Sequence, residues 1–139
     1  MKYKGKERRA CRRINVPGAT VTYKEEKFFL SKEKYVEEFL PVVEISRGGI
    51  RFLCQKLFTT TRKISLKVFI PEEESPLLLV GRVRWASSTA TMSYRYQIGI
   101  QFNPYGKRKK QNDPDILKRI IALEEKFLNY NDNNKSDSH

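Results

Sequence analysis

The fold of this chain is decided by residues 40–54, which read LPVVEISRGGIRFLC. Apolar residues dominate both ends of this stretch, and its middle holds a serine, an arginine and two adjacent glycines. Apolar β-branched and aromatic residues favour strands, whereas glycine and serine favour tight turns. We therefore expect a strand over 40–46, a turn at Arg47-Gly48-Gly49, and a second strand over 50–54.

Similar strand patterns occur on both sides of this hairpin. Residues 64–70 alternate cleanly between apolar and polar side chains and stop at Pro71, which cannot continue a sheet ladder. The other strands are expected at 19–24, after a Pro-Gly turn signal, and at 77–86 and 94–102. Short strands with this punctuation are typical of a small antiparallel β-barrel. Residues 25–39 fit either a strand or an inserted helical turn.

The end of the chain has a different pattern. Asp113-Pro114 is a good helix start, with an acceptor at the cap and proline in the first turn. Apolar residues then recur at helical spacing, which predicts a helix over about 114–128 with one buried face. That face either packs on the barrel or receives a partner. Residues 129–139 are polar, and we expect them to form a disordered tail.

The composition favours anionic partners. The 139 residues suffice for one domain with a core of its own, and Lys+Arg 28 against Asp+Glu 16 leaves a net charge of +12. This charge implies a nucleotide, nucleic acid or acidic membrane as partner without choosing among them. Much of it lies in a basic leader, residues 1–15, and in Lys107–Lys110, which we expect to form a solvated loop.

The residues needed for catalysis or metal binding are scarce. The sole histidine, His139, is the last residue, and two cysteines cannot close a zinc site alone. The acidic run 72–74 follows Pro71 and reads as a solvated loop. We expect no enzyme activity, no cofactor and no metal. Cys54 is expected in the core, whereas Cys11, among arginines, is either inert or a reactive thiol.

No signal peptide or apolar segment of ~20 residues is visible, so the expected location is a reducing cytoplasm without a transmembrane segment.

Two short stretches carry the chemistry. Residues 8–13, RRACRR, supply guanidinium groups that can grip phosphate, pair with guanine edges and stack on purines. Residues 44–49, EISRGG, supply a carboxylate, a hydroxyl and two glycines that let a ligand approach the backbone and permit a positive φ. Together they suit a ligand with both phosphates and guanine bases.

In this order, the two stretches make the chain resemble the PilZ family of bacterial cyclic di-GMP receptors. The family pattern RxxxR is matched by Arg9 and Arg13, and [D/N]xSxxG by Ser46 and Gly49, with Glu44 where Asp or Asn is usual. The resemblance extends from about Lys6 to Phe127. It includes residues 82–85, 98–102 and the final helix.

The resemblance implies a mainly β fold: a six-stranded antiparallel barrel over residues 16–128, with the C-terminal helix packed on it. It also implies a cytoplasmic bacterial receptor whose leader, a switch without an apolar anchor, closes over cyclic di-GMP and signals to an unidentified downstream protein. Arginine at position 8 implies an intercalated ligand dimer. The implied ligand-binding residues are Arg8, Arg9, Arg13, Glu44, Ser46, Gly48 and Gly49.

Two alternatives remain open. Glu44 is longer than Asp, so the chain could be a PilZ-like adaptor that no longer binds cyclic di-GMP. A basic small-barrel nucleic-acid binder would share the charge, and Tyr94-Arg95-Tyr96 is the only aromatic–basic interleaving that hints at it. Trp85, the only tryptophan, is expected in the core or at the barrel rim rather than as a stacking platform.

Overall fold

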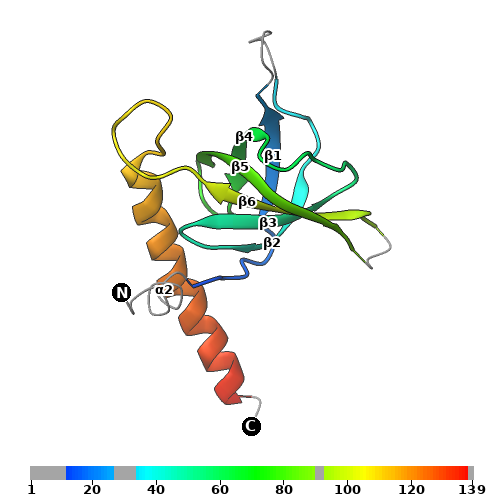
Figure 1. Ribbon diagram of the computed structural model, residues 1–139. Coiled ribbons are helices and arrows are strands. Elements are labelled where there is room, and N and C mark those ends of the chain that lie inside the picture. The colour runs from blue at the N-terminus through cyan, green and yellow to red at the C-terminus, as the bar shows by residue number, and fades with distance from the viewer. Residues whose placement is uncertain (1–11, 27–33, 90–92, 138–139) are drawn as a thin grey trace, which may run out of the picture.

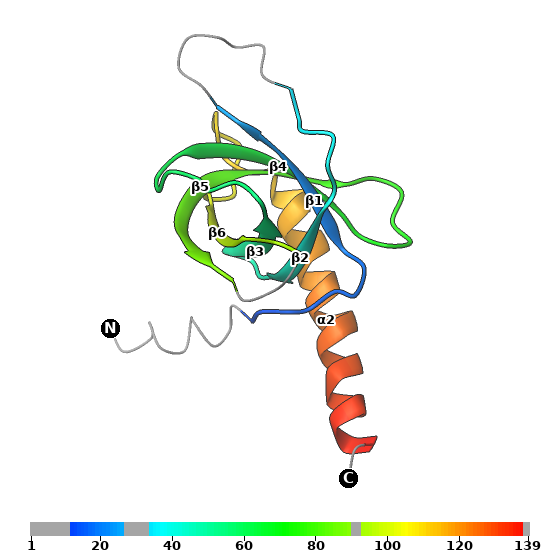
Figure 2. The same ribbon diagram turned by 90° about the vertical axis from the view of Figure 1, so that its right-hand side faces the viewer.

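The computed structural model describes residues 12–26, 34–89 and 93–137, with the backbone alone for 129–137. The described chain contains six strands and one helix. These are β1 (Thr20–Glu25), β2 (Leu40–Ile45), β3 (Gly49–Cys54), β4 (Lys63–Phe69), β5 (Leu77–Ser88), β6 (Tyr96–Phe102) and α2 (Pro114–Asp137). The strands close into an antiparallel barrel in the order β1-β2-β3-β6-β5-β4, and α2 runs past one side of it (Figures 1 and 2).

Alternation along β3 and β4 places apolar side chains inside the barrel. In β3, Ile50, Phe52 and Cys54 point inward and are buried, while the residues between them are partly exposed. The same period in β4 buries Ile64, Leu66 and Val68. Because the side-chain period of a strand is two, each inward apolar set leaves an outward set free to build a site. This confirms the predicted six-stranded barrel, and each strand begins and ends within two residues of its expected bounds.

Apart from Glu25, which ends β1, the undecided segment is neither strand nor helix where it is described. Residues 34–39 have no regular structure, and 27–33, with Phe28 and Phe29, lie outside the described residues. Tyr35 instead lies on the barrel, with the ammonium groups of Lys24 and Lys67 4.9 Å and 4.3 Å from its ring centroid.

The C-terminal helix packs on the barrel through its apolar face. The backbone N–H of Asp115 donates to Asp113 Oδ1 at 2.9 Å, which caps the first turn. Ile116, Ile120 and Leu123 are buried in the same core as the strands, so the packed helix is confirmed.

The helix end and the tail were predicted wrongly. The helix continues to Asp137 instead of stopping near residue 128, so residues 129–137 are not a disordered tail. No glycine or proline interrupts this stretch, and an existing helix extends at little cost.

The leader was expected to lack an apolar anchor, and this is wrong at its C-terminal end. Ile14 is 1% exposed and pairs with Ile45 through two backbone hydrogen bonds of 2.8 Å and 2.9 Å. Val16 is buried as well. Burying an isoleucine contributes about 1.5–3 kcal/mol, enough to hold this segment against β2. Residues 1–11, including Cys11, lie outside the described residues.

Two further expectations are met. Cys54 is buried, and burial raises the pKa of its thiol. Residues 107–110 are exposed in the loop between β6 and α2.

Candidate functional site

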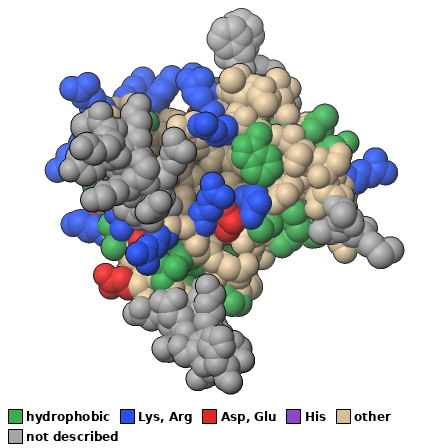
Figure 3. All heavy atoms as spheres, turned by 60° about the horizontal axis from the view of Figure 1, so that its bottom comes forward, with side chains coloured by type: hydrophobic (Ala, Val, Ile, Leu, Met, Phe, Trp, Pro, Cys, Tyr) green, Lys and Arg blue, Asp and Glu red, His purple; other side chains and the backbone are tan. Residues whose placement is uncertain are grey.

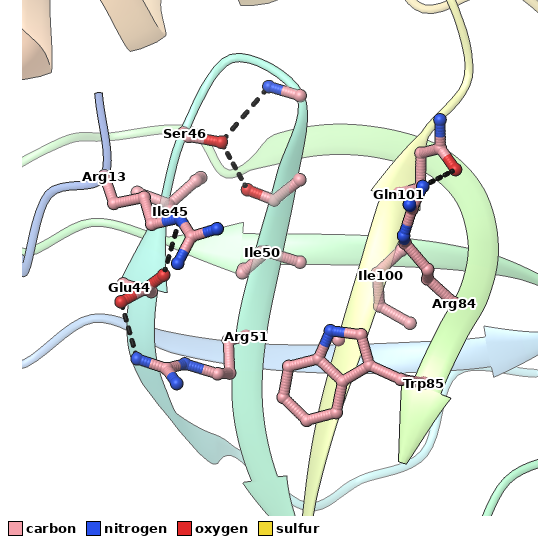
Figure 4. A pocket seen from close by; sticks show the side chains of 13 residues that line it. Arg13, Glu44, Ile45, Ser46, Ile50, Arg51, Arg84, Trp85, Ile100 and Gln101 are labelled. Carbon is pink, nitrogen blue, oxygen red and sulfur yellow. Dashed lines mark hydrogen bonds and ion pairs between the residues drawn. The ribbon is translucent and has the colours of Figure 1, made fainter. Parts of the chain in front are cut away.

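A pocket of about 450 Å³ lies on the outer wall of the barrel. Its walls come from the segment before β1, from the β2–β3 hairpin, and from β5 and β6 (Figure 4). The volume lies within the ~300–1,000 Å³ range of small-molecule sites. Its lining side chains include Arg13, Glu44, Ser46, Arg51, Arg84 and Trp85.

One carboxylate in the pocket contacts two arginines. Glu44 Oε1 lies 2.6 Å from Arg51 Nη2, and Glu44 Oε2 lies 3.4 Å from Arg13 Nε (Figure 4). Glu44 and Arg51 are register partners on β2 and β3, just after a bulge at Val43. The bulge adds one residue to β2 and re-aims the side chains that follow it. Glu44 therefore points outward, opposite Arg51.

The turn that follows Glu44 is closed by its own serine. The backbone N–H of Gly48 donates to Ser46 Oγ at 3.2 Å, and the backbone N–H of Ser46 donates to the Gly49 carbonyl oxygen at 2.8 Å. Ser46, Gly48 and Gly49 all line the pocket, as the sequence predicts.

The expected reason for the glycines was partly wrong. Neither Gly48 nor Gly49 has a positive φ. A Cβ on Gly49 would lie 2.3 Å from the carbonyl oxygen of Ile100, so glycine is needed there for the approach of β3 to β6. At Gly48 nothing lies within 4 Å of such a Cβ, which leaves open space beside the pocket.

The turn is also fastened to the helix. Arg47 donates two hydrogen bonds of 2.9 Å, one to each carboxylate oxygen of Glu124 on α2. Tyr105 Oη donates to the Arg47 carbonyl oxygen at 2.6 Å. Because paired charge-assisted bonds fix both distance and orientation, the turn between β2 and β3 is held against α2.

Trp85 forms the far wall of the pocket, which corrects its expected place in the core or at the rim. It is 37% exposed on the outward face of β5. A Cβ on its register partner Gly99 would lie 2.3 Å from the indole, so the ring lies directly against the bare backbone of β6. Arg84, next to it, donates to Gln101 Oε1 at 3.1 Å. An exposed, flatly supported indole can stack on a planar base.

The pocket favours anions. Arg13, Arg51 and Arg84 line it, and Glu44 is the one acidic residue among its lining residues. Lysine and arginine also dominate the charged side chains on the face shown in Figure 3. Within the described residues, no group of three His, Cys, Asp or Glu side chains could hold a metal ion, and no helix is long and apolar enough to cross a membrane.

The pocket brings together five of the seven predicted residues. Arg8 and Arg9 lie outside the described residues. Sequence reasoning missed Arg51, Arg84, Trp85 and Gln101 as lining residues. Two signals could have found some of them: the outward position of Arg51 in its alternating strand, and a glycine inside a strand at position 99, which marks a close approach.

The comparisons with known proteins agree with this architecture. The model of the PilZ domain family matches residues 7–119. The chain belongs to the PilZ family. Domains of this family act as receptors or adaptors.

A solved structure with the same fold is that of the Bacillus subtilis inhibitor of motility, MotI/DgrA. It superimposes with a TM-score of 0.52 at 16% sequence identity, over 84% of this chain and 51% of that one. This PilZ domain therefore spans about half the length of MotI/DgrA. No curated protein sequence matches the chain significantly.

Proposed function

We propose that this PilZ domain binds cyclic di-GMP in the outer-wall pocket and passes the signal to a partner protein in the bacterial cytoplasm. The observation that carries the proposal is the convergence of Arg13, Glu44, Ser46 and Gly49 on one pocket. Arg13, Ser46 and Gly49 match the two family patterns, and Glu44 stands where Asp or Asn is usual. The two segments lie about thirty residues apart in the sequence. One ligand bound in this pocket can therefore contact both stretches.

Each side chain has a role that its chemistry supports. Arg13 is 74% exposed and contacts Glu44 at 3.4 Å, so this ion pair is weak enough for a phosphate to replace it. Glu44, freed from Arg13, can accept hydrogen bonds from the Watson–Crick edge of a guanine. Trp85 offers its face to a base, and Arg84 adds a cation for the second phosphate.

Signalling would run through the leader. Arg9 grips the ligand together with Arg13, and the residues before Ile14 change position when the arginines are neutralised. Ile14 stays fixed on β2, so it acts as the pivot. Binding of an anion then orders or redirects the preceding residues and alters the surface offered to a partner.

Calorimetric titration with cyclic di-GMP tests the proposal. Arg9→Ala and Arg13→Ala should each weaken binding at least ~10-fold, because each removes a charge-assisted contact worth about 1.5–3 kcal/mol. Arg12→Ala is the matched control: Arg12 is exposed and does not line the pocket, so affinity should hold within about twofold. Unchanged affinity in both test variants, with intact circular dichroism, would overturn the proposal.

The same titration reports the number of ligands. If Arg8 stacks on an additional purine, as its position in the family pattern implies, the native chain binds two molecules and Arg8→Leu binds fewer. A ratio of one in the native chain would refute the ligand dimer.

The adaptor alternative draws on one feature of the site. Glu44 already occupies two of the arginines that a ligand would need. If this glutamate only repels phosphate, Glu44→Ala should bind cyclic di-GMP more tightly than the native chain. If it reads a guanine, Glu44→Ala should lose about 1–3 kcal/mol of binding free energy.

A further inference from the structure

Arg51, on the outward face of β3, lies outside the two family patterns and is the closest partner of Glu44. Its Nη2 is 2.6 Å from Glu44 Oε1, and the two side chains are 31% and 22% exposed. The Arg13 contact is longer, at 3.4 Å, and Arg13 is far more exposed. Charge-assisted hydrogen bonds are stronger when they are shorter and less exposed to water. Arg51 is therefore the residue that fixes the position of Glu44.

Glutamate needs such a partner more than aspartate does. Its additional methylene gives it one more rotatable bond, and holding it in a single rotamer costs more conformational entropy. Arg51 is its direct register partner, and the bulge at Val43 aims Glu44 toward it. The ion pair with Arg51 therefore restricts the conformations open to the Glu44 side chain.

A second observation at Arg51 supports a role in the site. Its Nε is buried and has no hydrogen-bond partner within the described part of the chain. A buried donor without an acceptor costs free energy and calls for an explanation.

We propose that Arg51 is a specificity-determining residue: it holds the Glu44 carboxylate where this group reads guanine and rejects adenine. The inference rests on the proposed function. A carboxylate has about four acceptor positions, and Arg51 uses one. The remaining lone pairs face the N1–H and exocyclic amine of guanine. Adenine presents an acceptor at N1, which the same carboxylate repels.

The test compares two ligands that differ in this edge. Affinities of the full chain for cyclic di-GMP and cyclic di-AMP are measured by calorimetry, for the native protein and for Arg51→Met. We expect the variant to lose about 10-fold more affinity for cyclic di-GMP than for cyclic di-AMP, beyond the loss that both ligands share through the missing charge. The preference for guanine should therefore fall about 10-fold. If Arg51 acted only as a positive charge, both ligands would weaken equally.

Arg84→Met is the matched control. It removes the same charge from the same pocket, but Arg84 contacts Gln101 and not Glu44. It should weaken both ligands by a similar factor and leave their ratio unchanged. In a Glu44→Ala background, Arg51→Met should have no further effect on the ratio, since the group that Arg51 positions is gone.

The outcomes separate the two proposals. A native chain that binds neither nucleotide would overturn the proposed function and this inference with it. A native chain that prefers cyclic di-GMP, with the same preference in Arg51→Met, would overturn the inference alone. If Arg51→Met does not fold, Arg51→Lys keeps the charge without the planar fork, and full retention of the preference in that variant would also overturn it.

Discussion

Two carboxylates, Glu124 on α2 and Glu44 on β2, differ in how arginines bind them. Glu124 on α2 is 6% exposed at its side chain, and a single arginine, Arg47, binds both of its oxygens at 2.9 Å. Glu44 on β2 is 22% exposed, and its two oxygens go to different arginines at 2.6 Å and 3.4 Å. We call the Arg47–Glu124 pair the closed pair, because one arginine binds both oxygens, and we call Glu44 the shared carboxylate, because two arginines bind it.

This difference indicates which ion pair stabilises the fold and which one a ligand can replace. A bidentate pair with a buried carboxylate resists substitution, because losing either partner leaves a charge without compensation. A shared carboxylate with one exposed partner can release that partner to another anion at little cost. The Arg47–Glu124 pair therefore fixes the turn, and the Arg13–Glu44 contact is the one a ligand can replace.

Removal of the closed pair should have the largest effect on the free energy of unfolding. Arg47→Met leaves Glu124 buried without its cation and should lower the free energy of unfolding by about 2–3 kcal/mol. This is less than a fully buried pair would cost, because the Arg47 side chain is 37% exposed. Denaturant unfolding measures it. Lys118→Met, which breaks an exposed pair with Asp115 on the same helix, is the control and should change little. Equal effects would contradict the distinction.

Alkaline pH should affect a buried side chain of the barrel, Tyr23, and leave the arginines of both ion pairs charged. Burial raises the pKa of Tyr23 to about 12, so the folded protein keeps a proton that the unfolded chain releases near pH 10. Stability from this group is complete below about pH 10 and is lost as the pH rises toward 12, by about 2 kcal/mol. The arginines stay charged throughout. Unfolding curves of native protein and Tyr23→Phe at several pH values should show a smaller loss in the variant. Parallel curves would contradict this assignment.

The hydrogen bond from Tyr105 to the turn should contribute less to stability. Tyr105→Phe removes the hydrogen bond to the Arg47 carbonyl oxygen, which should cost about 1 kcal/mol of stability. Thermal unfolding measures this loss. A variant as stable as the native protein would show that this hydrogen bond does not stabilise the turn.

The smallest effect on stability is expected at the shared carboxylate. Arg13→Ala should change the free energy of unfolding by less than about 0.5 kcal/mol, because the pair is exposed and Glu44 keeps Arg51. The same variant should lose ligand affinity, as described above. A loss of stability comparable to that of Arg47→Met would show that the leader is part of the fold rather than an exchangeable arm.

The fold was largely predictable because it depends on short-range patterns. Alternation over 64–70 and the serine–glycine turn at 46–49 act within a few residues, and both strands and turns formed where expected. The helix start at Asp113-Pro114 is equally local. Its end was missed because an existing helix continues through polar residues when no glycine or proline stops it.

By itself, the sequence determined the barrel, the family pattern and the presence of Arg13, Glu44, Ser46 and Gly49. Only the tertiary structure decided how these residues are used. Pairing of β3 with β6 and of β6 with β5 brings Trp85 and Arg84 to the pocket, and register on β2 and β3 joins Glu44 to Arg51. Strand order and register arise from contacts between distant segments, which no local pattern encodes.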